Sequence, residues 1–209
     1  MTDTILFLWT WTPYLLYGFL TNIGIAVFAM LIGTTAGFLA ERVCHGKMWL
    51  ITGPIRWGIT FLRNTPSLVL LFYLSVLAPN EISFGESGWT LTVPPWLKAG
   101  LALSASPMVL MYWNFESWRA QSASSSGIRR RELLGRILES FTITTLASSV
   151  SSLIGVSELI GRCNVIINAS SNKYSFVVYG YACLYFCIFL YAVQRTVLKL
   201  GSRTAFFHH

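Results

Sequence analysis

Charged residues are scarce in this chain: only 11% of its 209 residues are Asp, Glu, Lys or Arg, whereas 54% are hydrophobic. Soluble domains contain about 25% charged residues. So few charges cannot form a water-exposed surface around a chain of this length. The composition therefore predicts that most of the surface faces lipid or a protein partner.

Catalytic and metal-binding patterns are also missing. The sequence has no His-Glu-x-x-His pattern and no phosphate-binding loop, because Gly46-Lys47 has neither the upstream glycine nor a following Ser or Thr. His45 is the only internal histidine, so no serine nucleophile has an obvious partner. The four cysteines show no paired metal spacing, and Cys183 and Cys187 are expected to be buried thiols. The sequence indicates no enzyme, and no metal or cofactor site.

Long apolar runs are present instead. A transmembrane helix needs about 20 mostly apolar residues. Such runs predict spans at residues 14–40, 96–113, 137–159 and 176–193, and a split span at 49–78, with loops at 79–95 and 161–175. Gly33 and Gly37 in the first span have the small-xxx-small spacing that lets two helices pack closely. The expected fold is an all-α integral membrane protein of about five transmembrane helices in one domain, residues 1–209.

Residues 63–66 interrupt the second span with the sequence Arg63-Asn64-Thr65-Pro66. Proline removes a helical hydrogen bond, and a charge at membrane depth costs several kcal/mol. A broken helix is tolerated there only where protein or a watery cavity satisfies the freed backbone groups. This segment therefore points to a pathway through the protein or to a partner beside it, with Arg63, Asn64, Thr65 and Pro66 as the candidate residues.

The fourth span is rich in serine and threonine, including Ser148 and Ser152. Either this helix packs on its neighbours through small residues, or it lines a polar path. Glu139, near its start, either pairs with Arg136 or is solvated, unless it belongs to the membrane-embedded part of the helix.

Basic residues alternate between the loops. Most of them follow span one, precede span four or follow span five: Arg42, Lys47, Arg56, Arg119, Arg129, Arg130, Arg131, Arg136, Arg195, Lys199 and Arg203. The other loops hold only Lys98, Arg162 and Lys173. The positive-inside rule then predicts that the N-terminus is outside and the C-terminus is cytoplasmic. The net charge of +7 needs no nucleic-acid partner.

The segment 121–138 is polar and then rich in arginine. It is either a juxtamembrane helix whose arginines meet anionic lipid, or a docking element for a cytoplasmic partner.

These features together resemble the transmembrane subunits of bacterial ATP-binding-cassette (ABC) importers for polar amino acids, the histidine/glutamine permease family. Residues 61–72 read FLRNTPSLVLLF, similar to that family's F-x-R-[GN]-T-P-L-x-V-x-L-F. Residues 152–159 read SLIGVSEL, similar to its S-x-I-G-V-P-E-L. Residues 121–127 retain part of the E-A-A-x-x-x-G coupling signature. The resemblance covers nearly the whole chain.

The resemblance implies a type I importer permease in the bacterial inner membrane. Its expected partners are an ABC ATPase dimer that holds ATP and Mg, a second permease subunit that is a different chain, an extracytoplasmic amino-acid-binding protein, and lipid. Within the coupling segment it points to Gln121, Ser122, Ala123, Gly127, Arg129 and Arg130.

The chain departs from the family pattern at Gln121, Ser140 and Ser157, and it is shorter on both sides of the coupling segment. A non-transporting or regulatory permease-like subunit, or a stand-alone facilitator, are therefore the alternative functions.

Overall fold

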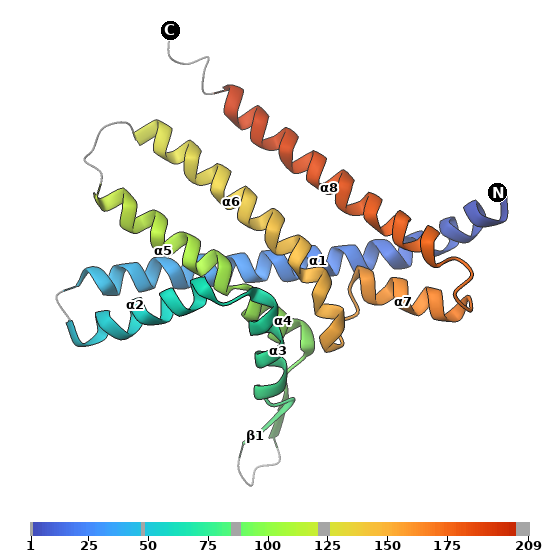
Figure 1. Ribbon diagram of the computed structural model, residues 1–209, viewed down its shortest axis with the longest axis horizontal. Helices are drawn as coiled ribbons and strands as arrows, with labels where there is room; N and C mark the ends of the chain where they lie inside the picture. The colour runs from blue at the N-terminus through green and yellow to red at the C-terminus, as the bar shows by residue number, and fades with distance from the viewer. Residues whose placement is uncertain (1, 47–48, 85–88, 121–125, 204–209) are drawn as a thin grey trace. The chain divides into compact units, whose positions relative to one another are not determined.

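The computed structural model describes residues 2–46, 49–84, 89–120 and 126–203 (Figure 1). It is helical apart from one short β-hairpin. The chain divides into two compact units: a terminal unit, residues 1–24 with 149–209, and a central unit, residues 25–148. Helix α1, Thr2–His45, contributes residues to both units and confirms the first predicted helix. The expectation of a single domain stays a prediction.

The central unit contains the predicted break. Helix α2, Trp49–Asn64, is followed after two residues by α3, Ser67–Leu77, and the two are bent by 111°. The segment expected as a loop contains an antiparallel hairpin of β1, Glu81–Phe84, and β2, Trp89–Thr92. Helices α4, Pro95–Leu103, α5, Ala105–Ala120, and α6, Ser126–Ser148, complete the unit.

The third predicted span is interrupted at Ser104, between α4 and α5. Pro107 explains the interruption, because it has no N–H to donate to the carbonyl four residues earlier, whereas a proline in the first turn of α5 is tolerated. The Ser104 hydroxyl donates to the Leu101 carbonyl at 2.7 Å and so serves another carbonyl of this turn.

The glycines of α1 let the α4–α5 junction approach closely, which confirms the packing expected from their spacing. A Cβ at Gly33 would collide with the Ser104 carbonyl oxygen, and a Cβ at Gly37 with the Met108 carbonyl oxygen. Any larger side chain at these two positions would push backbone away from backbone.

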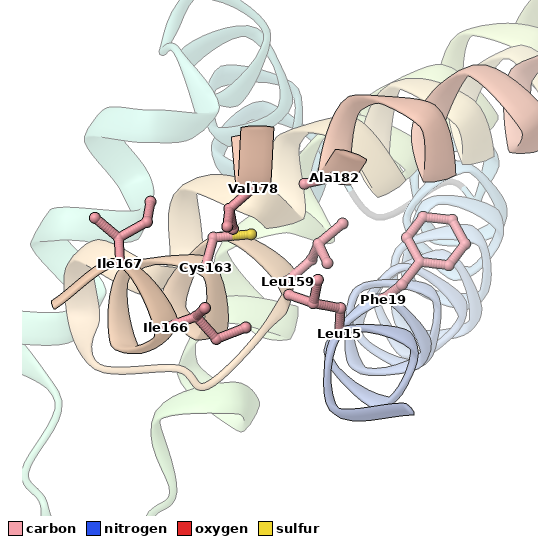
Figure 2. Close-up of a cluster of buried hydrophobic side chains, with 8 residues drawn as sticks. All are labelled: Leu15, Phe19, Leu159, Cys163, Ile166, Ile167, Val178 and Ala182. Atoms are coloured by element: carbon pink, nitrogen blue, oxygen red, sulfur yellow. The ribbon is translucent and has the colours of Figure 1, made fainter. Parts of the chain in front are cut away.

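The terminal unit contains a helix where a loop was expected. After α6 the chain forms a 3₁₀ turn, η2, Ser149–Ile154, and then α7, Leu159–Ala169, and α8, Ser175–Arg203. The prediction of a loop at residues 161–175 was therefore wrong for most of its length. Helices α1, α7 and α8 enclose the apolar core of the unit (Figure 2), formed by Leu15, Phe19, Leu159, Cys163, Ile166, Ile167, Val178 and Ala182.

Three helical segments of the described chain are long and apolar enough to cross a membrane: Thr4–His45, Glu132–Ile154 and Ser175–Thr196. The bent pair α2–α3 would make a fourth. The chain is thus a membrane protein, whereas the count of five spans and the orientation stay predictions. Many large apolar side chains are exposed, such as Ile188 on α8. Cys183 and Cys187 are exposed too, which corrects the expectation that they are buried.

Candidate functional site

The helix break in the central unit begins where α2 ends at Asn64. Pro66 precedes α3 with φ −58° and ψ 137°, an extended conformation outside the helical region, and no side chain caps the first turn of α3. Thr65 turns its hydroxyl back to donate to the Phe61 carbonyl at 2.8 Å. This bond serves one of the last carbonyls of α2, which have no helical N–H partner. The extended backbone at Pro66 and the Thr65 hydrogen bond therefore define the end of α2.

The polar side chains of this break lie at the surface of the unit. Arg63, Asn64 and Pro66 are exposed, and Thr65 is half-buried. The Arg63 guanidinium lies 5.4 Å from the centre of the Trp113 ring on α5. A cation over an aromatic ring at an exposed position gains about 0.5–1 kcal/mol. That gain is small compared with the cost of placing an arginine against lipid, so Arg63 needs water or a partner beside it.

Trp57 and Phe61 extend this surface along α2. Their rings stack with centroids 5.8 Å apart, and both side chains are more than half exposed. The break thus joins a cation, an amide and large aromatic groups on one exposed stretch. Such a mixture suits a surface that contacts another protein or encloses a path better than one that faces only lipid tails.

The two serines predicted for the path lie in consecutive elements, Ser148 in α6 and Ser152 in η2. Ser148 ends α6 and is fully buried, and its hydroxyl donates to the Thr145 carbonyl at 2.7 Å. Ser152 lies in η2, is half-buried, and donates to the Ser149 carbonyl at 3.2 Å. Both hydroxyls contact local backbone, which is a common role of serine in helical segments. Their use as path residues stays a prediction.

Sequence reasoning missed a buried polar cluster in the terminal unit. Glu158 is the N-cap of α7, and its carboxylate accepts from the Ile160 N–H at 2.9 Å and the Gly161 N–H at 3.0 Å. The Asn22 amide of α1 donates to the same carboxylate at 3.1 Å and accepts from the Leu159 N–H at 3.1 Å. Glu158 and Asn22 are fully buried. Together these bonds join the start of α7 to α1.

Two neighbours complete this cluster. Gly18, one turn before Asn22, allows the Leu159 backbone to approach so closely that a Cβ would lie 3.0 Å from it. The Arg162 guanidinium lies 4.4 Å from the Tyr14 ring centre and 4.6 Å from that of Tyr17. It also donates to the Tyr14 carbonyl at 3.1 Å and the Ser157 carbonyl at 3.1 Å.

A sequence signal for this cluster did exist. Acidic residues are enriched near helix starts, and Glu158 precedes the apolar Leu159-Ile160. The burial of Asn22 has no comparable local signal, because it depends on contact with residues more than 130 positions away in the chain.

The first five residues of the coupling segment, 121–125, lie outside the described residues, and these include Gln121, Ser122 and Ala123. Gly127, Arg129 and Arg130 belong to α6, but nothing is described of their side chains. A side-chain hydrogen bond joins α5 and α6, the helices on either side of residues 121–125. The Arg136 guanidinium donates to the buried Asn114 side-chain oxygen at 2.9 Å and to Glu132 at 2.7 Å. Arg136 therefore pairs with Glu132, and Glu139 is exposed.

Within the described residues, no group of three or more His, Cys, Asp or Glu side chains is placed to hold a metal ion.

No protein-family model and no curated protein matches this chain in sequence. In fold it is similar to a solved chain described as "Crystal structure of an amino acid ABC transporter with histidines", with a TM-score of 0.73 over 93% of this chain and 95% of that chain. The two sequences are 14% identical. The likeness therefore shows a similar fold over nearly the full length of both chains.

Proposed function

We propose that this chain is a permease subunit of an ATP-driven ABC importer for amino acids. It forms the translocation path in a dimer with a second permease subunit, and it docks a separate ATPase subunit that binds ATP and Mg. The observation that carries this proposal is the fold likeness, because it extends over nearly the full length of both chains. The bacterial inner membrane and an extracytoplasmic amino-acid-binding protein complete the proposed setting.

The break at residues 63–66 supports the path. Its arginine and amide are exposed on a unit whose neighbouring side chains are large and aromatic. In a single chain within lipid this arrangement is costly, whereas a second subunit or a water-filled path would solvate the same groups. We therefore propose Arg63, Asn64, Thr65 and Pro66 as path residues, and Ser148 and Ser152 as further candidates.

The region around α5 and α6 supports the docking role. The sequence between the two helices contains Gln121, Ser122 and Ala123. The first turns of α6 contain Gly127, Arg129 and Arg130. The Asn114–Arg136 hydrogen bond would transmit a force on this segment to both helices, because Asn114 is buried in α5. Coupling to an ATPase through these residues is part of the proposal.

Co-purification and uptake test the function. The chain, carrying an affinity tag, is expressed with its neighbouring ATPase and permease genes, and the purified complex is placed in liposomes. We expect the ATPase and a second permease to co-purify and labelled amino acid to accumulate only with ATP. A chain that purifies alone, and whose removal leaves uptake unchanged, would contradict the proposal.

Two variants separate the alternatives. Bulky replacements at Ala123 and Gly127 should abolish transport-coupled ATPase activity in a docking subunit. Unchanged activity would indicate a regulatory or non-transporting subunit. Uptake that persists without ATP hydrolysis and follows only the gradient would indicate a stand-alone facilitator.

A further inference from the structure

Lys98 of α4 is a buried cation with 3% of its surface exposed. Its ammonium group lies 2.7 Å from the Ala78 carbonyl oxygen, 2.8 Å from the Asn80 side-chain oxygen and 3.4 Å from the Ser75 carbonyl oxygen. An ammonium group has three N–H donors, and these contacts supply one oxygen for each. All three oxygens are neutral, and within the described chain no carboxylate forms an ion pair with Lys98.

The position of this charge has an electrostatic reason. Lys98 lies in the first turn of α4, where the partial positive charge of a helix N-terminus disfavours a cation. Its long side chain places the ammonium group at the carboxyl end of the neighbouring helix α3, which ends at Leu77. The last carbonyls of a helix lack N–H partners and carry partial negative charge. Lys98 therefore supplies the cation that the last turn of α3 itself lacks.

Helix α3 depends on such support. It has 11 residues, whereas a helix that spans a membrane needs about 20, so its last carbonyls depend on donors from neighbouring elements. Leu71 is the one buried residue of α3, and no side chain caps the first turn of this helix after Pro66. The backbone of residues 65–66 does not continue α2 into α3. In the central unit α3 packs against α4 (Figure 1), so this contact holds the segment beyond the break.

We propose that Lys98 is a positioning residue that fixes the carboxyl end of α3 to α4. The pair α3–α4 then behaves as one body, and movement of the bent segment is confined to Thr65–Pro66. The structural half of this inference is independent of the proposed transport function. The statement that it positions the path residues rests on that function.

Hydrogen exchange on the full chain in lipid nanodiscs tests the structural half. Lys98→Met keeps an unbranched side chain but removes the charge and the donors. We expect backbone amides at the end of α3, including the Ala78 N–H that donates to the Leu74 carbonyl, to exchange about tenfold faster, since a hydrogen bond to a charged group is lost. The Val178 amide of α8 should not change, because it lies in the other unit.

Three further variants sharpen the test. Asn80→Ala removes one acceptor and should give a smaller acceleration at the same amides. Lys98→Arg retains a cation and should exchange more slowly than Lys98→Met. Lys173→Met removes an exposed lysine from the terminal unit and should change nothing at α3. If Lys98→Met and Asn80→Ala both leave exchange at the end of α3 at the wild-type rate, the inference is overturned.

Uptake by the reconstituted complex tests the functional half. Lys98→Met should lower the maximal rate severalfold and leave the half-saturating concentration nearly unchanged, because Lys98 is buried and in this proposal acts on the position of α3 rather than on the substrate. A full rate in spite of faster exchange would refute the positioning role. An absence of ATP-driven uptake in the wild-type complex would instead count against the proposed function.

Discussion

The Asn22 side-chain amide lies 3.1 Å from the Glu158 carboxylate, and both residues are fully buried in the terminal unit. Asn22 contributes a donor to Glu158 and an acceptor to the Leu159 N–H. Removing it leaves a buried backbone N–H without its acceptor and a buried carboxylate with one donor fewer. The Asn22 amide can donate to Glu158 and accept from the Leu159 N–H at the same time, because its nitrogen and its oxygen are bonded to the same carbon and point in different directions.

Asn22→Leu should therefore destabilise the chain although leucine suits an apolar helix. An unsatisfied buried polar group costs about 1–3 kcal/mol, and more when it is charged. We expect the apparent melting temperature, followed by tryptophan fluorescence in detergent, to fall by several degrees. Asn168→Leu is the matched control, since Asn168 is exposed at the end of α7. Equal melting temperatures for the two variants would show that the Asn22–Glu158 bond does not stabilise the fold.

Two glycines on α1 make a second prediction. Gly37→Ala places a methyl group against the Met108 carbonyl oxygen, a backbone atom that cannot rotate away. Overpacking of this kind costs about 1–3 kcal/mol. Gly24→Ala is the control on the same helix, because a Cβ there meets nothing within 4 Å.

Since alanine is favoured over glycine in a helix by about 0.5–1 kcal/mol, Gly24→Ala should be neutral or stabilising. The same glycine-to-alanine change should therefore lower the melting temperature at Gly37 and leave it unchanged or raise it at Gly24. A loss of stability in Gly24→Ala as large as in Gly37→Ala would contradict the close packing of α1 with α5.

Arg63 carries the third prediction, which rests on the proposed function. Arg63→Ala removes the exposed cation at the helix break and its contact with Trp113. We expect the rate of ATP-driven uptake to fall at least severalfold while the complex still assembles. Val76→Ala is the control, because Val76 is an exposed apolar residue of α3. Small, equal losses for both variants would remove Arg63 from the proposed path.

The elements that local chemistry dictates could be predicted. The break at residues 63–66 follows from proline's missing N–H, and α1 and α8 follow from long apolar runs. The close packing at Gly33 and Gly37 follows from their missing side chains. Each of these properties belongs to a residue or to its near neighbours in sequence.

Other elements could not be predicted in this way. Helix α7 was expected as a loop, although its start is stabilised by Glu158 together with the distant Asn22. Lys98 was counted as a loop charge, yet it is buried against the end of α3. The exposure of Cys183 and Cys187 depends on which face of α8 packs on its neighbours.

The sequence by itself determined that this is a helical membrane protein with a polar interruption in its second span. Apolar run length, scarcity of charge and the covalent structure of proline are sufficient for that conclusion. Only the tertiary structure decided where the buried polar groups find partners. Asn22 with Glu158, and Lys98 with the end of α3, are pairings between segments distant in sequence, and their stability comes from desolvated contacts that no local pattern encodes.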